Sequence, residues 1–145
     1  MNIDFAIGLH IVGFLTSNDG ELVSSNVLAA SFGTSPVVLR RVLVRLNQSG
    51  LVDTKRGANG GSRLARPASS INLREVYEAA SQNIELFARH PAGAEPVSNI
   101  LGNYINEFYL EAESSLLAHL ESISVADMDT VVRPKIMKAL NCHPN

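Results

Sequence analysis

The chain of 145 residues has very little cysteine, and this scarcity excludes several kinds of protein. Its one thiol, on Cys142, cannot form a disulfide within the chain or give a metal site two cysteine ligands. No segment approaches about 18 uninterrupted apolar residues, so no segment is expected to span a membrane. Because no export signal is recognisable either, we expect a reducing, cytoplasmic location.

Motifs for catalysis and metal binding are missing as well. The four histidines are scattered, and none lies four residues from another histidine or from the cysteine, so no metal site is expected. His10 lies among apolar residues and is interpreted as a hydrogen-bonded core histidine, and Cys142 as an inert thiol. Since no Ser-His-Asp set, paired carboxylates or phosphate-binding loop can be recognised, no catalytic residue is named and an enzyme is not expected.

What the sequence does contain is enough apolar surface for a core, with 46% hydrophobic residues and a mean hydropathy of +0.09. Apolar residues recur at helical spacing over residues 3–17, in a stripe that begins at Ile3 and is expected to face the core. A short second helix should follow Ser24 and end at Gly33. The segment Thr34-Ser35-Pro36 supplies a cap and a proline at the first helical position, so a third helix is predicted up to Gly50.

A hairpin is predicted next, because residues 51–54 and 62–66 are typical of short strands around the glycine-rich loop 55–61. The glycines of this loop permit the positive backbone dihedrals of a hairpin tip and leave it free of bulky side chains. Asn72 then favours the start of a further helix, which should reach about residue 80. Residues 1–80 are therefore interpreted as one winged helix-turn-helix domain.

The rest of the chain is predicted to be a connector and a helical arm. Residues 81–97 contain the His-Pro-Ala-Gly-Ala-Glu-Pro stretch, which should not continue a helix. A long amphipathic helix over 98–121 carries an apolar stripe that is wide for one solvent-exposed helix. A capping box from Ser124 to Asp127 predicts a last helix to about residue 140, so 98–145 is interpreted as the arm.

Charge is divided unevenly along the chain, although its formal total is only -2. Residues 34–66 carry seven basic residues against one acidic residue, a net charge of +6, whereas the remainder has a net charge of -8. The basic part coincides with the helix-turn-helix and the hairpin. A helix fits the major groove of B-DNA, and a basic hairpin beside it can neutralise phosphates as a wing, in which Arg66 also takes part. The candidate DNA-binding residues are Thr34, Ser35, Val37, Arg40, Arg41, Arg45, Lys55, Arg56, Asn59, Gly60, Gly61 and Arg63.

Two other interpretations of the basic residues stay open. A run of charge is often only a solvated face. The module could also bind a protein with an acidic surface instead of specific DNA, and salt-dependent binding to duplex DNA would separate the two functions.

Residues 46–67, from Leu46 through the glycine loop to Pro67, resemble the wing of the BadM/Rrf family of bacterial winged helix-turn-helix transcriptional regulators. The resemblance implies a homodimer joined by the long helix 98–121, with two recognition helices on a palindromic operator. We expect this regulator to act as a repressor. It implies base contacts from the start of the third helix and phosphate contacts from the wing. An effector is left open, with Tyr104, Phe108 and Tyr109 able to line a pocket or simply to belong to the core or dimer interface.

The chain departs from this family in two places. Many members hold an iron-sulphur cluster on three cysteines before the long helix, but residues 88–97 contain no cysteine. The sequence is therefore similar to the cluster-free, YwnA-like branch, and no cofactor is expected. At the N-terminus, Asn2-Ile3-Asp4 replaces a basic, hydroxyl-rich lead, which argues against a phosphate contact there.

Overall fold

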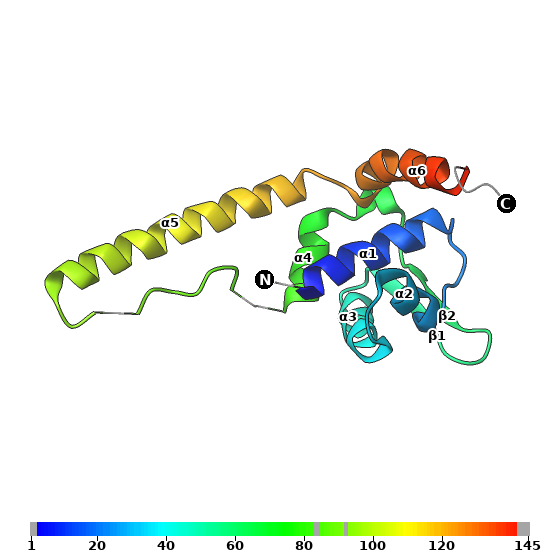
Figure 1. Cartoon of the computed structure of the whole chain (residues 1–145), viewed down its shortest axis with the longest axis horizontal. Helices are drawn as coiled ribbons and strands as arrows, with labels where there is room; N and C mark the ends of the chain where they lie inside the picture. The colour runs from blue at the N-terminus through cyan, green and yellow to red at the C-terminus, as the bar shows by residue number, and fades with distance from the viewer. Residues whose placement is uncertain (1–2, 83–84, 92, 142–145) are drawn as a thin grey trace.

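The computed structural model describes residues 3–82, 85–91 and 93–141, and within them the chain is mainly helical with one small hairpin. This confirms the predicted fold class of a winged helix-turn-helix with a long helix behind it (Figure 1). Cys142 lies outside the described residues. The elements in chain order are α1 (Ile3–Ser17), α2 (Ser25–Phe32), α3 (Pro36–Gln48), β1 (Val52–Lys55), β2 (Gly61–Leu64), the 3-10 turn η1 (Ala68–Ser70), α4 (Leu73–Ser81), α5 (Pro96–Glu121) and α6 (Val125–Asn141).

The part of the chain without α5 and its connector, called the body here, consists of α1 to α4, the hairpin and α6. Helix α1 lies at its centre and packs against α3, α4 and α6. It buries Ile7, Ile11, Val12 and Leu15 almost completely. The predicted stripe is therefore wrong at its start, because Ile3 is 52% exposed while Val12, on another side of the helix, is buried. A helix with neighbours on several sides buries more than one stripe, which a single amphipathic pattern cannot represent.

The helix-turn-helix forms as its capping residues predict. Ser24 and Ser35 accept hydrogen bonds from Val27 N and Val38 N, which satisfies amides at the starts of α2 and α3. Gly33 ends α2 with φ at 74°, a left-handed conformation that glycine adopts without strain. No single helix within the described ranges is long and apolar enough to cross a membrane, and α2 and α3 meet that test only together, across a bend of 115°.

The wing is an antiparallel hairpin in which Val52 pairs with Leu64 and Lys55 with Gly61. Strand β1 lies one residue later than predicted, because the Leu51 amide still donates to the Leu46 carbonyl in the turn that follows α3, and β2 begins one residue and ends two residues earlier than predicted. Strand β2 is also paired on its other side, since Val23 and Ser62 exchange backbone hydrogen bonds of 2.9 and 2.8 Å. This bridge fixes the wing to the segment that leads into α2.

The start of α6 is tied to the start of α4. Leu73 N donates to the Ile123 carbonyl, and Val125 N donates to the Ile71 carbonyl. The predicted caps form at both helices: Asn72 with Glu75, and Ser124 with Asp127. Figure 1 shows α6 against α1, on the side away from α3 and the wing, so α6 packs with the body rather than extending the arm. The division of the chain at residues 80 and 97 stays a prediction.

The projecting arm consists of α5 and the connector that returns along it (Figure 1). The helix begins at Pro96, two residues earlier than predicted, because a proline is tolerated in the first turn, where its missing N–H has no helical partner. His90 N donates to Asn106 Oδ1 at 2.8 Å, and the ring of Phe87 stacks on Tyr109 at 4.7 Å. The large apolar side chains that α5 leaves exposed are Val97, Ile100, Leu101, Tyr104, Phe108 and Leu110.

Candidate nucleic-acid interface

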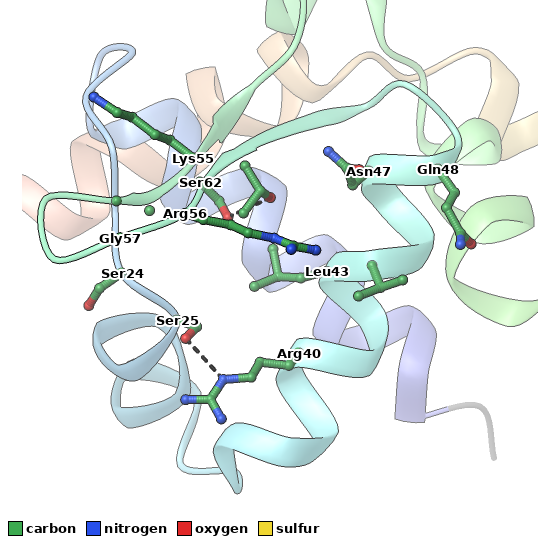
Figure 2. Close-up of a pocket in the computed structure, with 14 residues that line it drawn as sticks. Ser24, Ser25, Arg40, Leu43, Asn47, Gln48, Lys55, Arg56, Gly57 and Ser62 are labelled. Carbon is green, nitrogen blue, oxygen red and sulfur yellow. Dashed lines mark hydrogen bonds between the residues drawn. The ribbon is translucent and has the colours of Figure 1, made fainter.

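A hollow of about 510 Å³ lies between α3, the start of α2 and the wing. Figure 2 shows side chains from all three elements around it. The hollow therefore joins the predicted recognition helix to the predicted wing in one continuous surface. Its lining residues are Ser24, Ser25, Arg40, Leu43, Val44, Asn47, Gln48, Thr54, Lys55, Arg56, Gly57, Gly60, Gly61 and Ser62.

The first turn of α3 carries three predicted base-contact residues. Ser35 is its exposed N-cap, Thr34 is half-buried before it, and Val37 is 74% exposed. The first amides of a helix have no helical partner, and together with the helix dipole they favour a phosphate or another anion. The outer face of α3 continues through Val44 and Gln48, both exposed.

Arg40 lies at the edge of the hollow and is oriented by α2. Its Nε donates to Ser25 Oγ and its Nη2 to Asn26 Oδ1, each at 3.3 Å (Figure 2 shows the first bond). Both acceptors are neutral, so the charge of Arg40 is positioned without being paired. Ser24 is predicted only as a helix cap, and no pattern in the sequence indicates that Ser24 and Ser25 also line the hollow beside Arg40.

The wing presents exposed basic side chains on both strands and in the loop. Arg56 lies across the hollow toward α3, whereas Lys55 extends away from it (Figure 2). Arg63 is exposed on β2, opposite Asp53 in the strand register, and Asn59 is exposed in the loop. No carboxylate of the described residues forms an ion pair with Lys55, Arg56 or Arg63.

Backbone conformation and contacts within the protein explain the glycines of the wing. Only Gly57 of this loop has a positive φ, at 112°. A Cβ on Gly60 would lie 2.1 Å from the Lys55 carbonyl oxygen, and one on Gly61 would lie 2.7 Å from the Val23 carbonyl oxygen. The closeness of backbone segments therefore explains Gly60 and Gly61 without a ligand, and a role for them in DNA contact stays a prediction.

Arg45 does not join the exposed basic face as predicted, and Arg41 joins it with only part of its surface. Both pair with Asp4 of α1, at 2.7 and 2.8 Å, and the Asp4 side chain is only 8% exposed. Arg45 is 17% exposed and also donates to the Ala80 carbonyl at 2.8 Å, so it faces α1 and α4 instead of solvent. Arg41 keeps half of its surface exposed. Asp4, where a family lead would be basic, thus holds α3 in place.

Arg66 is likewise engaged within the protein. Its guanidinium contacts the Glu75 carboxylate and the Ser70 carbonyl, on the far side of the wing from the loop. Burial alone would raise the pKa of Glu75, but the hydrogen bond from the Asn72 backbone and the pairing with Arg66 lower it below its ordinary value. Arg66 therefore fixes the return of the chain from β2 to α4.

His10 forms the hydrogen bond that its surroundings predict, although it is half-buried rather than in the core. Its Nε2 lies 2.7 Å from Ser31 Oγ, and its ring packs against Phe14 and Phe32. Burial lowers the pKa of His10, because the charged form loses solvation. The contact fastens α2 to α1 and so helps position the helix-turn-helix.

The connector between α4 and α5 does not fit an iron-sulphur cluster. It contains no cysteine, Glu85 pairs with Arg89, and His90 Nδ1 is bonded to the Pro91 carbonyl. No group of three metal-ligating side chains occurs in the part of the chain that the structure describes. That the protein binds no cluster stays a prediction.

Known proteins place this arrangement in one family. The family model Rrf2, described as "Iron-dependent Transcriptional regulator", matches residues 1–130. YwnA of Bacillus subtilis, provisionally named as an HTH-type transcriptional regulator, is 32% identical over 130 residues, covering 88% of this chain and 96% of YwnA. The HTH-type transcriptional regulator NsrR of Bacillus subtilis is 30% identical over 139 residues, with 91% and 90% covered.

The fold is shared with solved structures. A crystal structure of a provisionally named transcriptional regulator from Lactobacillus plantarum superposes with a TM-score of 0.78, at 24% identity, over 92% of this chain and 91% of that one. At this identity the likeness concerns the fold alone. The family match covers most of the chain, and its helix-turn-helix, wing and long helix are all present. The chain therefore belongs to the Rrf2 family of transcriptional regulators.

Proposed function

We propose that this transcriptional regulator binds a palindromic operator as a homodimer and acts as a repressor in the cytoplasm. The observation that carries the proposal is the shared position of the exposed outer face of α3, Arg40 and the unpaired basic side chains of the wing. A helix in the major groove with cations beside it contacts base edges and phosphates at the same time. Lys55, Arg56 and Arg63 supply the phosphate contacts in this proposal.

The second half of the proposal concerns assembly through α5. Six large apolar side chains between Val97 and Leu110 are exposed on one projecting helix. Five of them, all but Leu110, recur at spacings of three and four residues on one side of the helix, and an exposed apolar patch of this kind marks an interaction site. Pairing with a second copy through a twofold axis would bury it and place two α3 helices about 34 Å apart, one turn of DNA.

We further propose that the protein works without a resident cofactor and without catalysis of its own. The connector lacks the thiolates of a cluster. A cavity of about 220 Å³ beside Phe87 and Tyr109 is the place where an effector would reach both the connector and α5.

The test is a selection of genomic fragments bound by the full chain, followed by titration of the enriched duplex at several salt concentrations. We expect a palindromic site and an affinity that falls steeply with salt. Replacing Arg40 and Arg63 together by glutamine should weaken binding and flatten the log-log salt slope by roughly 0.9 for each phosphate that is no longer neutralised. Arg74→Gln, on α4 and paired with Glu78 and Glu121, is the matched control and should leave the slope unchanged.

Two results would contradict the proposal. If the double variant keeps both the affinity and the slope of the parent, the basic face does not bind DNA, and a protein partner with an acidic surface becomes the better interpretation. If light scattering at micromolar concentration gives only the monomer mass, the homodimer is wrong.

A further inference from the structure

The outer face of α3 carries two exposed valines that the packing of the chain does not explain. Val37 is 74% exposed and Val44 is 55% exposed, whereas Leu39, Val42 and Leu46 on the opposite face are fully buried. The hydrophobic core of the described residues includes neither valine. Because both side chains are exposed, they contribute little to the packing of the fold and remain available to contact a binding partner of α3.

The positions of the two valines follow from helix geometry. Seven residues make almost two turns, so Val37 and Val44 lie on one line, about 10.5 Å apart along the axis. Gln48 continues that line by one further turn. The valines therefore occupy the centre of the exposed face of α3.

Arginine side chains lie on both sides of the line through Val37 and Val44. Arg40 lies on the side of the hollow, where it bonds to Ser25 and Asn26, and Arg41 lies on the side of α1, where it bonds to Asp4 while staying half exposed. A helix in the major groove places its central residues over base edges and its flanks near the two phosphate strands. The distribution of charge thus favours DNA over an apolar protein surface as the occupant.

The chemistry of valine restricts what it can contact there. Its side chain has no hydrogen-bonding atom, and the 5-methyl group of thymine is the apolar feature that the major groove offers. A spacing of about 10.5 Å corresponds to roughly three base-pair steps of 3.4 Å each. We infer that Val37 and Val44 contact the methyl groups of two thymines about three base pairs apart in each half-site, and this inference rests on the proposed function.

The test uses the full chain and the duplex that it enriches from a randomised pool. We expect A·T pairs at two positions about three base pairs apart in each half-site. Replacing thymine by uracil at one of them removes only the methyl group, and should weaken binding about fourfold in each half-site, as burial of one methyl implies.

Serine variants assign each methyl to its valine. Serine has a helix propensity close to that of valine, so Val44→Ser and Val37→Ser should fold. We expect each variant to bind the thymine and uracil duplexes equally at one position while still discriminating at the other. Val131→Ser, at an exposed valine of α6, is the matched control and should discriminate at both positions.

The outcomes separate this inference from the function on which it rests. If the chain enriches a site but binds its thymine and uracil forms equally, or if both serine variants keep the discrimination, the inference is wrong and the proposed function stands. If the chain enriches no duplex at all, both fail together.

Discussion

The basic residues between positions 34 and 66 divide into two groups that the sequence alone does not distinguish. Arg45 pairs with Asp4 of α1 and Arg66 with Glu75 of α4, and Arg41 shares Asp4 with Arg45. Arg40 and the wing residues Lys55, Arg56 and Arg63 have no carboxylate partner among the described residues. The first group joins α3 and the wing to the body, although Arg41 also keeps half of its surface exposed, and the second group faces outward.

The comparison shows that the net charge of a segment overestimates the charge that its binding surface presents. The segment carries a net charge of +6, but its paired arginines contribute to the position of α3 and the wing more than to the outward field. Buried or half-buried ion pairs depend on the packed structure and are little screened by salt, whereas exposed cations without a carboxylate partner respond to salt and to phosphate. The two groups should therefore differ in what their replacement changes.

The largest effect is expected where the paired group is most buried. Asp4→Asn would leave the guanidinium of Arg45, which is 17% exposed, without its carboxylate and with only the Ala80 carbonyl. Removing one partner of a buried pair costs about 3 kcal/mol of the free energy of unfolding. Urea denaturation monitored by circular dichroism measures this difference.

Asp53→Asn is the control for this measurement, because Asp53 is the exposed carboxylate of the same basic segment. We expect little change in its free energy of unfolding. Equal stability of Asp4→Asn and the parent would mean that Arg45 does not depend on Asp4, and the division into two groups would lose its main support.

Local rules in the sequence predict the elements well because their causes are local. The caps at Ser24, Ser35 and Asn72 and the stop at Gly33 are all present. Each depends on residues within about four positions, so neighbouring side chains decide it. Even the errors at β1 and at the start of α5 are only one or two residues.

The site is predicted less well because its residues depend on distant partners. The charge of Arg45 on α3 predicts a role in DNA binding, but its partner Asp4 lies 41 positions away. The small size of Gly61 predicts close approach to DNA, while its cause is the backbone of Val23. Neither relation leaves a local pattern, because only the packed structure brings these segments together.

The second-largest effect is expected for the outward-facing cations, where a substitution should change DNA binding rather than the stability of the fold. Arg56→Gln should weaken binding to the enriched operator by roughly tenfold at 0.1 M salt for each phosphate that it leaves without a cation, and should flatten the salt slope by about 0.9. Arg66→Gln, in the paired group of the same wing, should keep the slope of the parent. Fluorescence anisotropy over a range of salt concentrations measures both. A flattened slope for Arg66→Gln with an unchanged one for Arg56→Gln would reverse the assignment.

The smallest expected effect is a dependence of stability on pH, to which only the paired group of arginines should contribute. The hydrogen bond from the Asn72 backbone and the pairing with Arg66 hold the pKa of Glu75 below its ordinary value of 4.5 despite burial. A carboxylate with a lowered pKa in the folded state stabilises the fold above its unfolded pKa, and this stability is lost as the pH falls through the folded pKa. Unfolding midpoints in urea should therefore decline below about pH 4.5, where the unfolded chain takes up the proton first.

Replacing Arg66 removes one of the two interactions that lower this pKa, so the decline should be shallower in Arg66→Gln than in the parent. Arg63→Gln, whose guanidinium has no carboxylate partner among the described residues, should keep the parent's pH dependence. Both variants lose one positive charge, so the general effect of net charge on acid stability is the same in each. Any difference between their pH profiles thus measures the pairing of Arg66 with Glu75, and identical profiles would place Arg66 among the free cations.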